Sequence, residues 1–256
     1  MPANLNGNNL KASRKTLSKS KPPRWLLSLT NNFWLLLIVA IFCQHTPYLS
    51  VPFNWLESYF HELSHGIGAI LSGGSIVQIQ LFSNGAGLCT TQGGWRIVIA
   101  FSGYFGAVLW GLLIYKIADT KGHYSRYLSM FLVVIILLST LLYAADLLTF
   151  IIAMSLALLF ASTIKLSNNY FMPVLLKLFA LIVLLNSVNS PLYLLNKANL
   201  SSLGGANVAG DSANLAQATF IPEFIWITVW CAFGAWALLH ISGVSISFFK
   251  RTKSRD

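Results

Sequence analysis

Long apolar segments dominate the chain. Each is close to the length of about 20 residues that a helix needs to cross a membrane, and they lie near residues 25–44, 54–72, 95–117, 127–143, 145–164, 171–188 and 219–242. Only 9% of the residues are charged and 55% are hydrophobic, whereas a soluble domain carries about 25% charged residues. The pattern predicts an all-α polytopic membrane protein with six or seven transmembrane helices, forming one integral membrane domain over residues 24–249.

A different pattern follows the second apolar segment. Residues 75–81 alternate between apolar and polar side chains, and an Asn84-Gly85 pair follows them. Period-two alternation next to an Asn-Gly turn predicts a short membrane-associated β-hairpin near residues 75–92. Irregular backbone at membrane depth must be covered by protein or water. The hairpin could therefore line a cavity, where an edge strand could hold an extended peptide, or it could be an ordinary interfacial hairpin.

The net charge of +10 comes largely from the two ends of the chain. Residues 1–23 are predicted to form a disordered basic cytoplasmic tail, and residues 250–256 a basic C-terminal tail. Such clusters favour the cytoplasmic side and contact with membrane lipids, so we expect no nucleic-acid partner. We expect the run from Trp25 to be a retained span, since it is long for a signal peptide. Two basic ends on one side require an even number of spans, so either one candidate, expected within 127–164, does not cross fully, or the charge rule does not hold for this chain.

Small residues and cysteines indicate packing rather than chemistry. Gly103 and Gly111 stand at a spacing that lets another helix approach closely, which predicts tight packing and nothing more. The three cysteines are far apart in the sequence and are expected to be small buried hydrophobic residues. A polar stretch over residues 189–217 is predicted to contain a loop in its middle.

One short motif carries candidate chemistry: His61-Glu62-Leu63-Ser64-His65, within an apolar run. On a helix the two histidines lie one turn apart on one face, so both imidazoles can bind the same Zn²⁺. Glu62 lies about 100° round the helix from His61, where it can move protons for a zinc-bound water without being a ligand. A chance match is expected in about one such chain in a thousand. We therefore predict His61 and His65 as metal ligands and Glu62 as the catalytic residue.

A catalytic zinc needs a third protein ligand. The acidic and histidine candidates are Glu57, Asp146, Asp211, Glu223 and His240. Glu57 could orient His61 from four residues before it, or lie at the level of the lipid headgroups. Asp146 lies in an apolar run, where it could be functional, paired, or in a turn between two helices. Asp211 begins a predicted helix after a glycine-rich loop, and could point back into the bundle or simply cap that helix.

The segment Phe60 to Gly66, followed by Gly73-Gly74 and the predicted hairpin, resembles the site-2-protease-like M50 membrane metallopeptidases, in particular the M50B-like branch. The resemblance covers roughly residues 53–240. It implies that an Asp at the start of a later helix is the third ligand, after an Asn-x-x-Pro-like element. Here the segment Asn186 to Pro191 precedes Asp211, at a greater interval than the family pattern has. The resemblance therefore favours Asp211.

The resemblance implies a membrane-embedded zinc metalloprotease that cleaves membrane protein substrates within or near the bilayer, with Glu62 activating a zinc-bound water. Zn²⁺ is the only cofactor implied, and the expected partners are a transmembrane protein substrate and membrane lipids. We expect a multi-pass protein of a bacterial inner membrane, and its oligomeric state stays open. The alternatives are a non-catalytic M50-like protein that binds or stabilises a membrane partner, and a small transporter. The intact His61, Glu62 and His65 favour the enzyme.

Overall fold

The computed structural model describes residues 32–120, 122–165, 171–201 and 210–243. The predicted tails, 1–23 and 250–256, lie outside these residues. The described elements are the helices α2 (Phe33–His45), α3 (Ser50–Leu71), α4 (Arg96–Ala118), α5 (Gly122–Tyr143), α6 (Leu147–Lys165), α7 (Phe171–Ser201), α8 (Asp211–Thr219) and α9 (Glu223–Ile241), with the strands β1 (Ser75–Leu81) and β2 (Gly87–Gln92). This confirms the predicted all-α polytopic architecture with one short hairpin.

Five helices are each long and apolar enough to cross a membrane: α4, α5, α6, α7 and α9. The pair α2 and α3 passes the same test only together, with a bend of 103° between its members. Tyr48, in the break, has a left-handed backbone with φ of 64°. If this bent pair is one span, the described residues hold six spans, an even number.

The segment 127–164 was expected to contain a helix that does not cross fully, and this expectation is wrong. Helices α5 and α6 both have the length and apolar composition of a span. The difference from the predicted seven spans arises at the start of the chain. There two predicted spans form the bent pair of α2 and α3, which counts as one span. The cause is the break in the helical backbone near Tyr48, which apolar content does not reveal.

The hairpin forms over the predicted residues. Strands β1 and β2 are antiparallel, from Ser75 opposite Gln92 to Leu81 opposite Gly87. Gly85, in the turn, has a φ of +89°, a conformation that glycine adopts without steric cost. The edge of β1 that faces away from β2 is hydrogen-bonded to the α5–α6 connection, where the Ala145 N–H donates to the carbonyl oxygen of Ile79. Strand β2 packs instead against α3.

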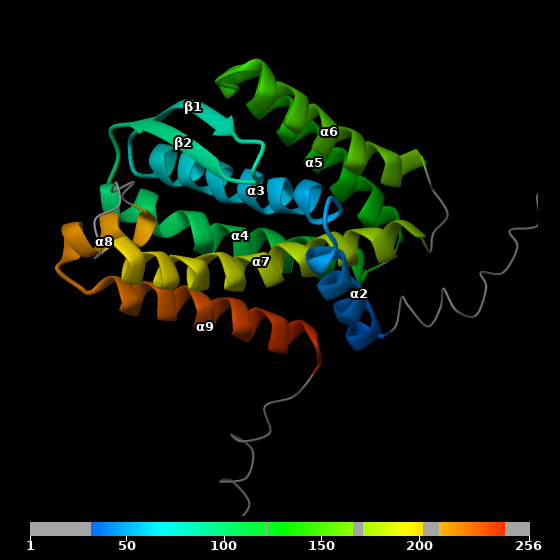
Figure 1. Ribbon diagram of the computed structural model, residues 1–256. Coiled ribbons are helices and arrows are strands. Elements are labelled where there is room, and N and C mark those ends of the chain that lie inside the picture. The colour runs from blue at the N-terminus through cyan, green and yellow to red at the C-terminus, as the bar shows by residue number, and fades with distance from the viewer. Residues whose placement is uncertain (1–31, 121, 166–170, 202–209, 244–256) are drawn as a thin grey trace, which may run out of the picture.

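Helix α3 runs through the middle of the molecule (Figure 1), with the hairpin over one of its ends and α4 and α7 alongside. Every residue from Leu56 to Gly66 is buried, so other elements surround this part of the helix. Phe60, for example, stacks on Trp110 of α4 and meets Phe160 of α6 edge to face. Because α3 is enclosed on all sides, its polar side chains are held inside the protein as well.

Helix α7 extends further than the sequence predicted. It continues through Pro191 to Ser201, so the first part of the polar stretch 189–217 is helical, and the middle of that stretch, 202–209, lies outside the described residues. Proline lacks the N–H that would bond to the carbonyl one turn earlier, and the helix continues past Pro191 without that hydrogen bond. Helix α8 then starts at Asp211, at the same end of the bundle as the hairpin (Figure 1).

Candidate metal centre

The two motif histidines face each other across one turn of α3, as their spacing predicted. The Nε2 atoms of His61 and His65 are 3.0 Å apart. The Nδ1 atom of His65 lies 2.6 Å from the carbonyl oxygen of Ile99. Since a carbonyl can only accept, Nδ1 carries the proton and donates. In the neutral ring this leaves a lone pair on Nε2 of His65, directed toward His61 and available to a metal.

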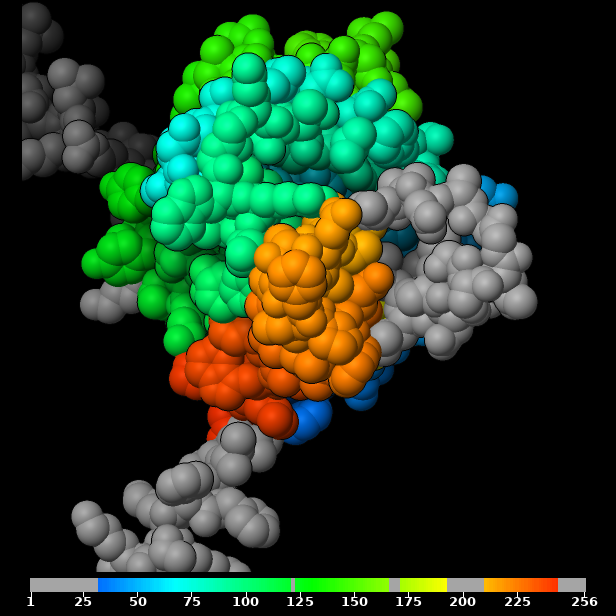
Figure 2. Space-filling model, turned by 90° about the vertical axis from the view of Figure 1, so that its left-hand side faces the viewer, coloured from blue at the N-terminus to red at the C-terminus, as the bar shows by residue number. Residues whose placement is uncertain are grey.

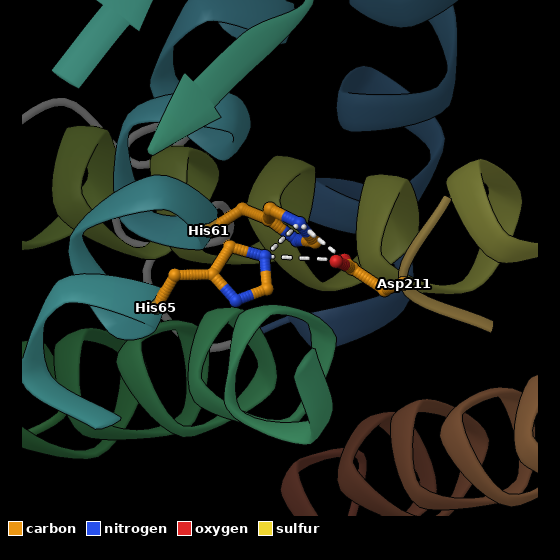
Figure 3. Close-up of side chains that lie close together, drawn as sticks. All are labelled: His61, His65 and Asp211. Atoms are coloured by element: carbon orange, nitrogen blue, oxygen red, sulfur yellow. Dashed lines mark hydrogen bonds and ion pairs between the residues drawn. The ribbon is translucent and has the colours of Figure 1, made fainter. Parts of the chain in front are cut away.

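Asp211 completes the group from a distant part of the sequence. One of its carboxylate oxygens, Oδ2, lies 3.0 Å from Nε2 of His61 and 3.1 Å from Nε2 of His65 (Figure 3). The alternative that Asp211 caps α8 is wrong, because the N-cap is Gly210 and no side chain caps this helix. Burial alone would raise the pKa of Asp211. The nearby His65 and the hydrogen bonds of both histidines outweigh it and hold this pKa well below its usual value.

The residues present fit a zinc ion. Two imidazole nitrogens and one carboxylate oxygen form the donor set of a catalytic zinc site. With bonds of about 2.0–2.1 Å in a tetrahedral arrangement, ligand atoms lie roughly 3.3 Å apart. The three observed separations, 3.0, 3.0 and 3.1 Å, are close to that value. Three electron-pair donors directed at one point repel one another unless a proton or a cation lies between them.

Helix α4 comes close to the histidines because of a glycine. A Cβ atom added at Gly103 would overlap the rings of both His65 and His61. One turn further along, a Cβ at Gly106 would overlap the Ser64 side chain. Tyr104 meets the His61 ring edge to face, with 4.4 Å between the ring centroids. The glycine spacing in α4 was interpreted as packing alone, whereas Gly103 provides the space that the two imidazoles occupy.

Glu62 points from α3 toward the hairpin. It is buried, with 5% of its surface exposed, and its carboxylate accepts a hydrogen bond from the backbone N–H of Cys89 in β2. A Cβ added at Gly87 would lie 2.6 Å from Cγ and 2.7 Å from Oε1 of Glu62. The start of β2 therefore lies directly against this carboxylate, and a glycine is what allows the close approach.

A cavity of about 1010 Å³ is lined by the side chains of His61, Glu62, His65 and Asp211. It is bounded by the hairpin, α3, the start of α4, α7 and α8. Figure 2 shows the hollow between the hairpin and α8. Of the two alternatives for the hairpin, the structure agrees with the one in which it lines a cavity.

A family model described as Peptidase M50B-like matches residues 34–241, which include both α3 and α8. The chain belongs to the M50B-like peptidase family. Membership makes it a membrane metallopeptidase in kind. Comparisons with curated proteins and with solved structures gave no match.

Two further candidates lie away from the candidate metal-binding group, which consists of His61, His65 and Asp211. Asp146 is exposed in the α5–α6 connection, where it accepts hydrogen bonds from the Thr149 N–H at 2.7 Å and from Gln80 Nε2 at 2.8 Å. These hydrogen bonds lower the pKa of Asp146. Glu223 accepts a hydrogen bond from the Ser212 hydroxyl at 3.0 Å.

The remaining candidates also lie outside the group of three ligand atoms. His240 stacks on Trp236 near the end of α9. Glu57 is buried, with 6% of its surface exposed. The cause is that α3 is enclosed by other elements at this point. Cys89 lines the cavity, where burial raises the pKa of its thiol to about 12, and it is not one of the three grouped ligand residues.

Proposed function

We propose that this M50B-like protein is a zinc metalloprotease that cleaves peptide bonds of membrane proteins within or near the bilayer. One observation carries the proposal: ligand atoms of His61, His65 and Asp211 converge within 3.1 Å of one another in a cavity that also contains Glu62. A catalytic zinc site needs three protein ligands and an open fourth position, and the cavity provides the opening.

His61, His65 and Asp211 would hold the zinc ion. When bound, zinc would polarise the scissile carbonyl and make water more acidic. Glu62, next to His61 on the helix, would accept a proton from the attacking water and deliver it to the leaving amine. The Cys89 N–H would hold the Glu62 carboxylate in place and offset part of the cost of its burial.

The hairpin offers a place for an extended substrate. Among the described residues, β2 has one hydrogen-bonded strand neighbour, β1, and it borders the cavity at Leu88, Cys89 and Thr91. A substrate segment that unwinds could pair with the other edge of β2, which would bring a peptide bond close to Glu62. The substrate class that fits this arrangement is a single-span membrane protein whose cleaved segment becomes extended.

The proposal also places the protein in a bacterial inner membrane, with its basic ends on the cytoplasmic side. The orientation rests on the charge distribution, since Lys and Arg accumulate in cytoplasmic loops and tails. The bacterial inner membrane rests on the resemblance to the M50B-like branch. Cell fractionation combined with protease access from the periplasmic side tests it. Recovery of the chain in another membrane, or digestion of the tails from outside, would contradict it.

The test of activity compares wild type with Glu62→Gln and His65→Ala. Each purified chain is reconstituted with a panel of single-span membrane proteins in phosphatidylethanolamine–phosphatidylglycerol vesicles. Products are identified by mass spectrometry, and bound metal by elemental analysis. We expect one zinc per chain in wild type, and cleavage that falls by about 10²–10⁴ in Glu62→Gln without loss of zinc. The His65→Ala variant should lose both the bound zinc and the cleavage activity.

Three results would contradict the proposal. If the purified wild-type protein carried no stoichiometric metal, the proposed zinc site would be wrong. Full cleavage by Glu62→Gln would remove Glu62 from the reaction. Zinc bound by a wild type that cleaves no member of the panel would favour the non-catalytic alternative, in which the same scaffold binds a membrane partner.

A further inference from the structure

A single arginine joins α4 to α8 at the mouth of the cavity. Arg96 is an exposed residue and the first residue of α4, four positions after the end of β2. One of its guanidinium nitrogens, Nη2, donates to Oδ1 of Asn214 at 2.8 Å and to Oε1 of Gln217 at 2.8 Å. Among the described residues that line the cavity, it is the only Lys or Arg.

Helix α8 needs such a contact to hold its position. It has nine residues, and isolated helices shorter than about 12–15 residues are marginal in water, so tertiary contacts must fix it. One such contact comes from its own Leu215, which is fully buried in a cluster with Tyr104 and Trp230. Asp211, Asn214 and Gln217 follow one another at intervals of three residues, which places them along one side of the helix. The side of α8 that presents Asp211 to the histidines is therefore also the side that Arg96 holds.

We propose that Arg96 is a positioning residue for the third metal ligand. Its charged hydrogen bonds to the side-chain amides of Asn214 and Gln217 fix the rotation of α8 about its axis and its position along that axis. This position determines where the Asp211 carboxylate meets His61 and His65. Hydrogen bonds from a charged donor are roughly twice as strong as neutral ones, and the planar guanidinium also constrains direction. Since Arg96 lies four positions after the end of β2, it also connects the hairpin to helix α8. This inference rests on the proposed zinc site.

Metal affinity tests the inference without a substrate. Zinc affinity is measured by competition with a chelator for wild type, Arg96→Ala, Arg96→Lys and the double variant Asn214→Ala/Gln217→Ala. Residues that orient a ligand typically contribute 10–100-fold to metal affinity. We expect zinc affinity to fall by about 10–100-fold in Arg96→Ala and in the double variant, and by less in Arg96→Lys. The matched control is Lys116→Ala, an exposed basic residue at the other end of α4, which should bind zinc as wild type does.

A second background separates positioning from a general effect on folding. In Asp211→Ala no carboxylate remains to be positioned, so adding Arg96→Ala should change the residual two-histidine affinity by less than about twofold. A weaker competing chelator is used for this pair. Cobalt substituted for zinc adds a spectroscopic readout. Arg96→Ala should shift the cobalt absorption bands toward those of Asp211→Ala, and Lys116→Ala should not.

The outcomes separate this inference from the proposed function. Wild type that binds no zinc would overturn both. Zinc bound with equal affinity by wild type and Arg96→Ala, or by wild type and the double variant, would overturn the role of Arg96 alone. An equal loss from Arg96→Ala with and without Asp211 would show that Arg96 only stabilises the fold. If Arg96→Ala does not fold, the double variant removes the same hydrogen bonds from the other helix and gives the decision.

Discussion

A methyl group added at Gly103 should displace both histidine ligands. In Gly103→Ala the new Cβ would lie 2.7 Å from Cε1 of His61, and it would overlap His65 as well. Carbon atoms in ordinary contact are about 3.5–4.0 Å apart, so the rings or the α4 backbone must move by about 1 Å. Metal sites require their ligand distances to be met within about 0.2 Å. We expect zinc affinity to fall by about 10–100-fold, which corresponds to roughly 1.4–2.8 kcal/mol.

Gly111→Ala is the matched control for this substitution. It makes the same change in the same helix, and its Cβ would lie 2.7 Å from Cγ and 2.9 Å from Cδ2 of Leu184, away from the metal-binding group. Overpacking of this kind typically costs about 1–3 kcal/mol of stability. Both variants gain the same helix propensity from alanine. Thermal unfolding should therefore be affected in both, whereas zinc affinity should fall only in Gly103→Ala.

The assay is competition for zinc between the purified protein and a chelator, with unfolding of the metal-free protein followed in parallel. Wild-type zinc affinity in Gly103→Ala would refute the reasoning, because the rings could not then be where the structure has them. Equal loss of affinity in both variants would also refute it, since the effect would come from general destabilisation. A change in the cobalt spectrum confined to Gly103→Ala would locate the disturbance at the ligands.

Two further substitutions test other parts of the site. Gly87→Ala would push a Cβ against the Glu62 carboxylate, so zinc content should stay unchanged while cleavage of a reconstituted single-span substrate falls by about 10²-fold; unchanged cleavage would contradict this. Asp211→Ala should lose zinc, as measured by elemental analysis, whereas Asp146→Ala should keep it and only lower the unfolding temperature, because Asp146 caps α6. Zinc loss in Asp146→Ala alone would reverse this assignment.

Local patterns were enough to predict most of the elements and two of the three members of the metal-binding group. Alternation and an Asn-Gly pair predicted the hairpin, and a spacing of four residues placed His61 and His65 on one face. Asp211 could not be derived in this way, because 146 residues separate it from His65 and spacing carries no information over that distance. The resemblance to the M50B-like family, together with its place at a helix start, favoured it. The structure brings it to the histidines.

Other features of the site have no local signal. Gly103 and Gly87 matter for the side chains that lie against them, and a sequence shows only that a glycine is present. Arg96 looked like one basic residue among many, since its two amide partners lie 118 and 121 residues away. For Asp146 the sequence left three alternatives open. The structure agrees with the turn between α5 and α6, which places this residue at the surface.

The position of the hairpin is explained by the free-energy cost of burying the Glu62 carboxylate. A carboxylate enclosed in a membrane protein loses its hydration, and helix α3 cannot replace it because the backbone N–H groups there are already bonded within the helix. An edge of β-sheet is one of the few structures that brings free backbone N–H groups to such a place. Strand β2 does so through Cys89, and Gly87 lets it come close enough. The same exposed edge is what an extended substrate would need, so the element that stabilises Glu62 also suits the delivery of a peptide bond to it.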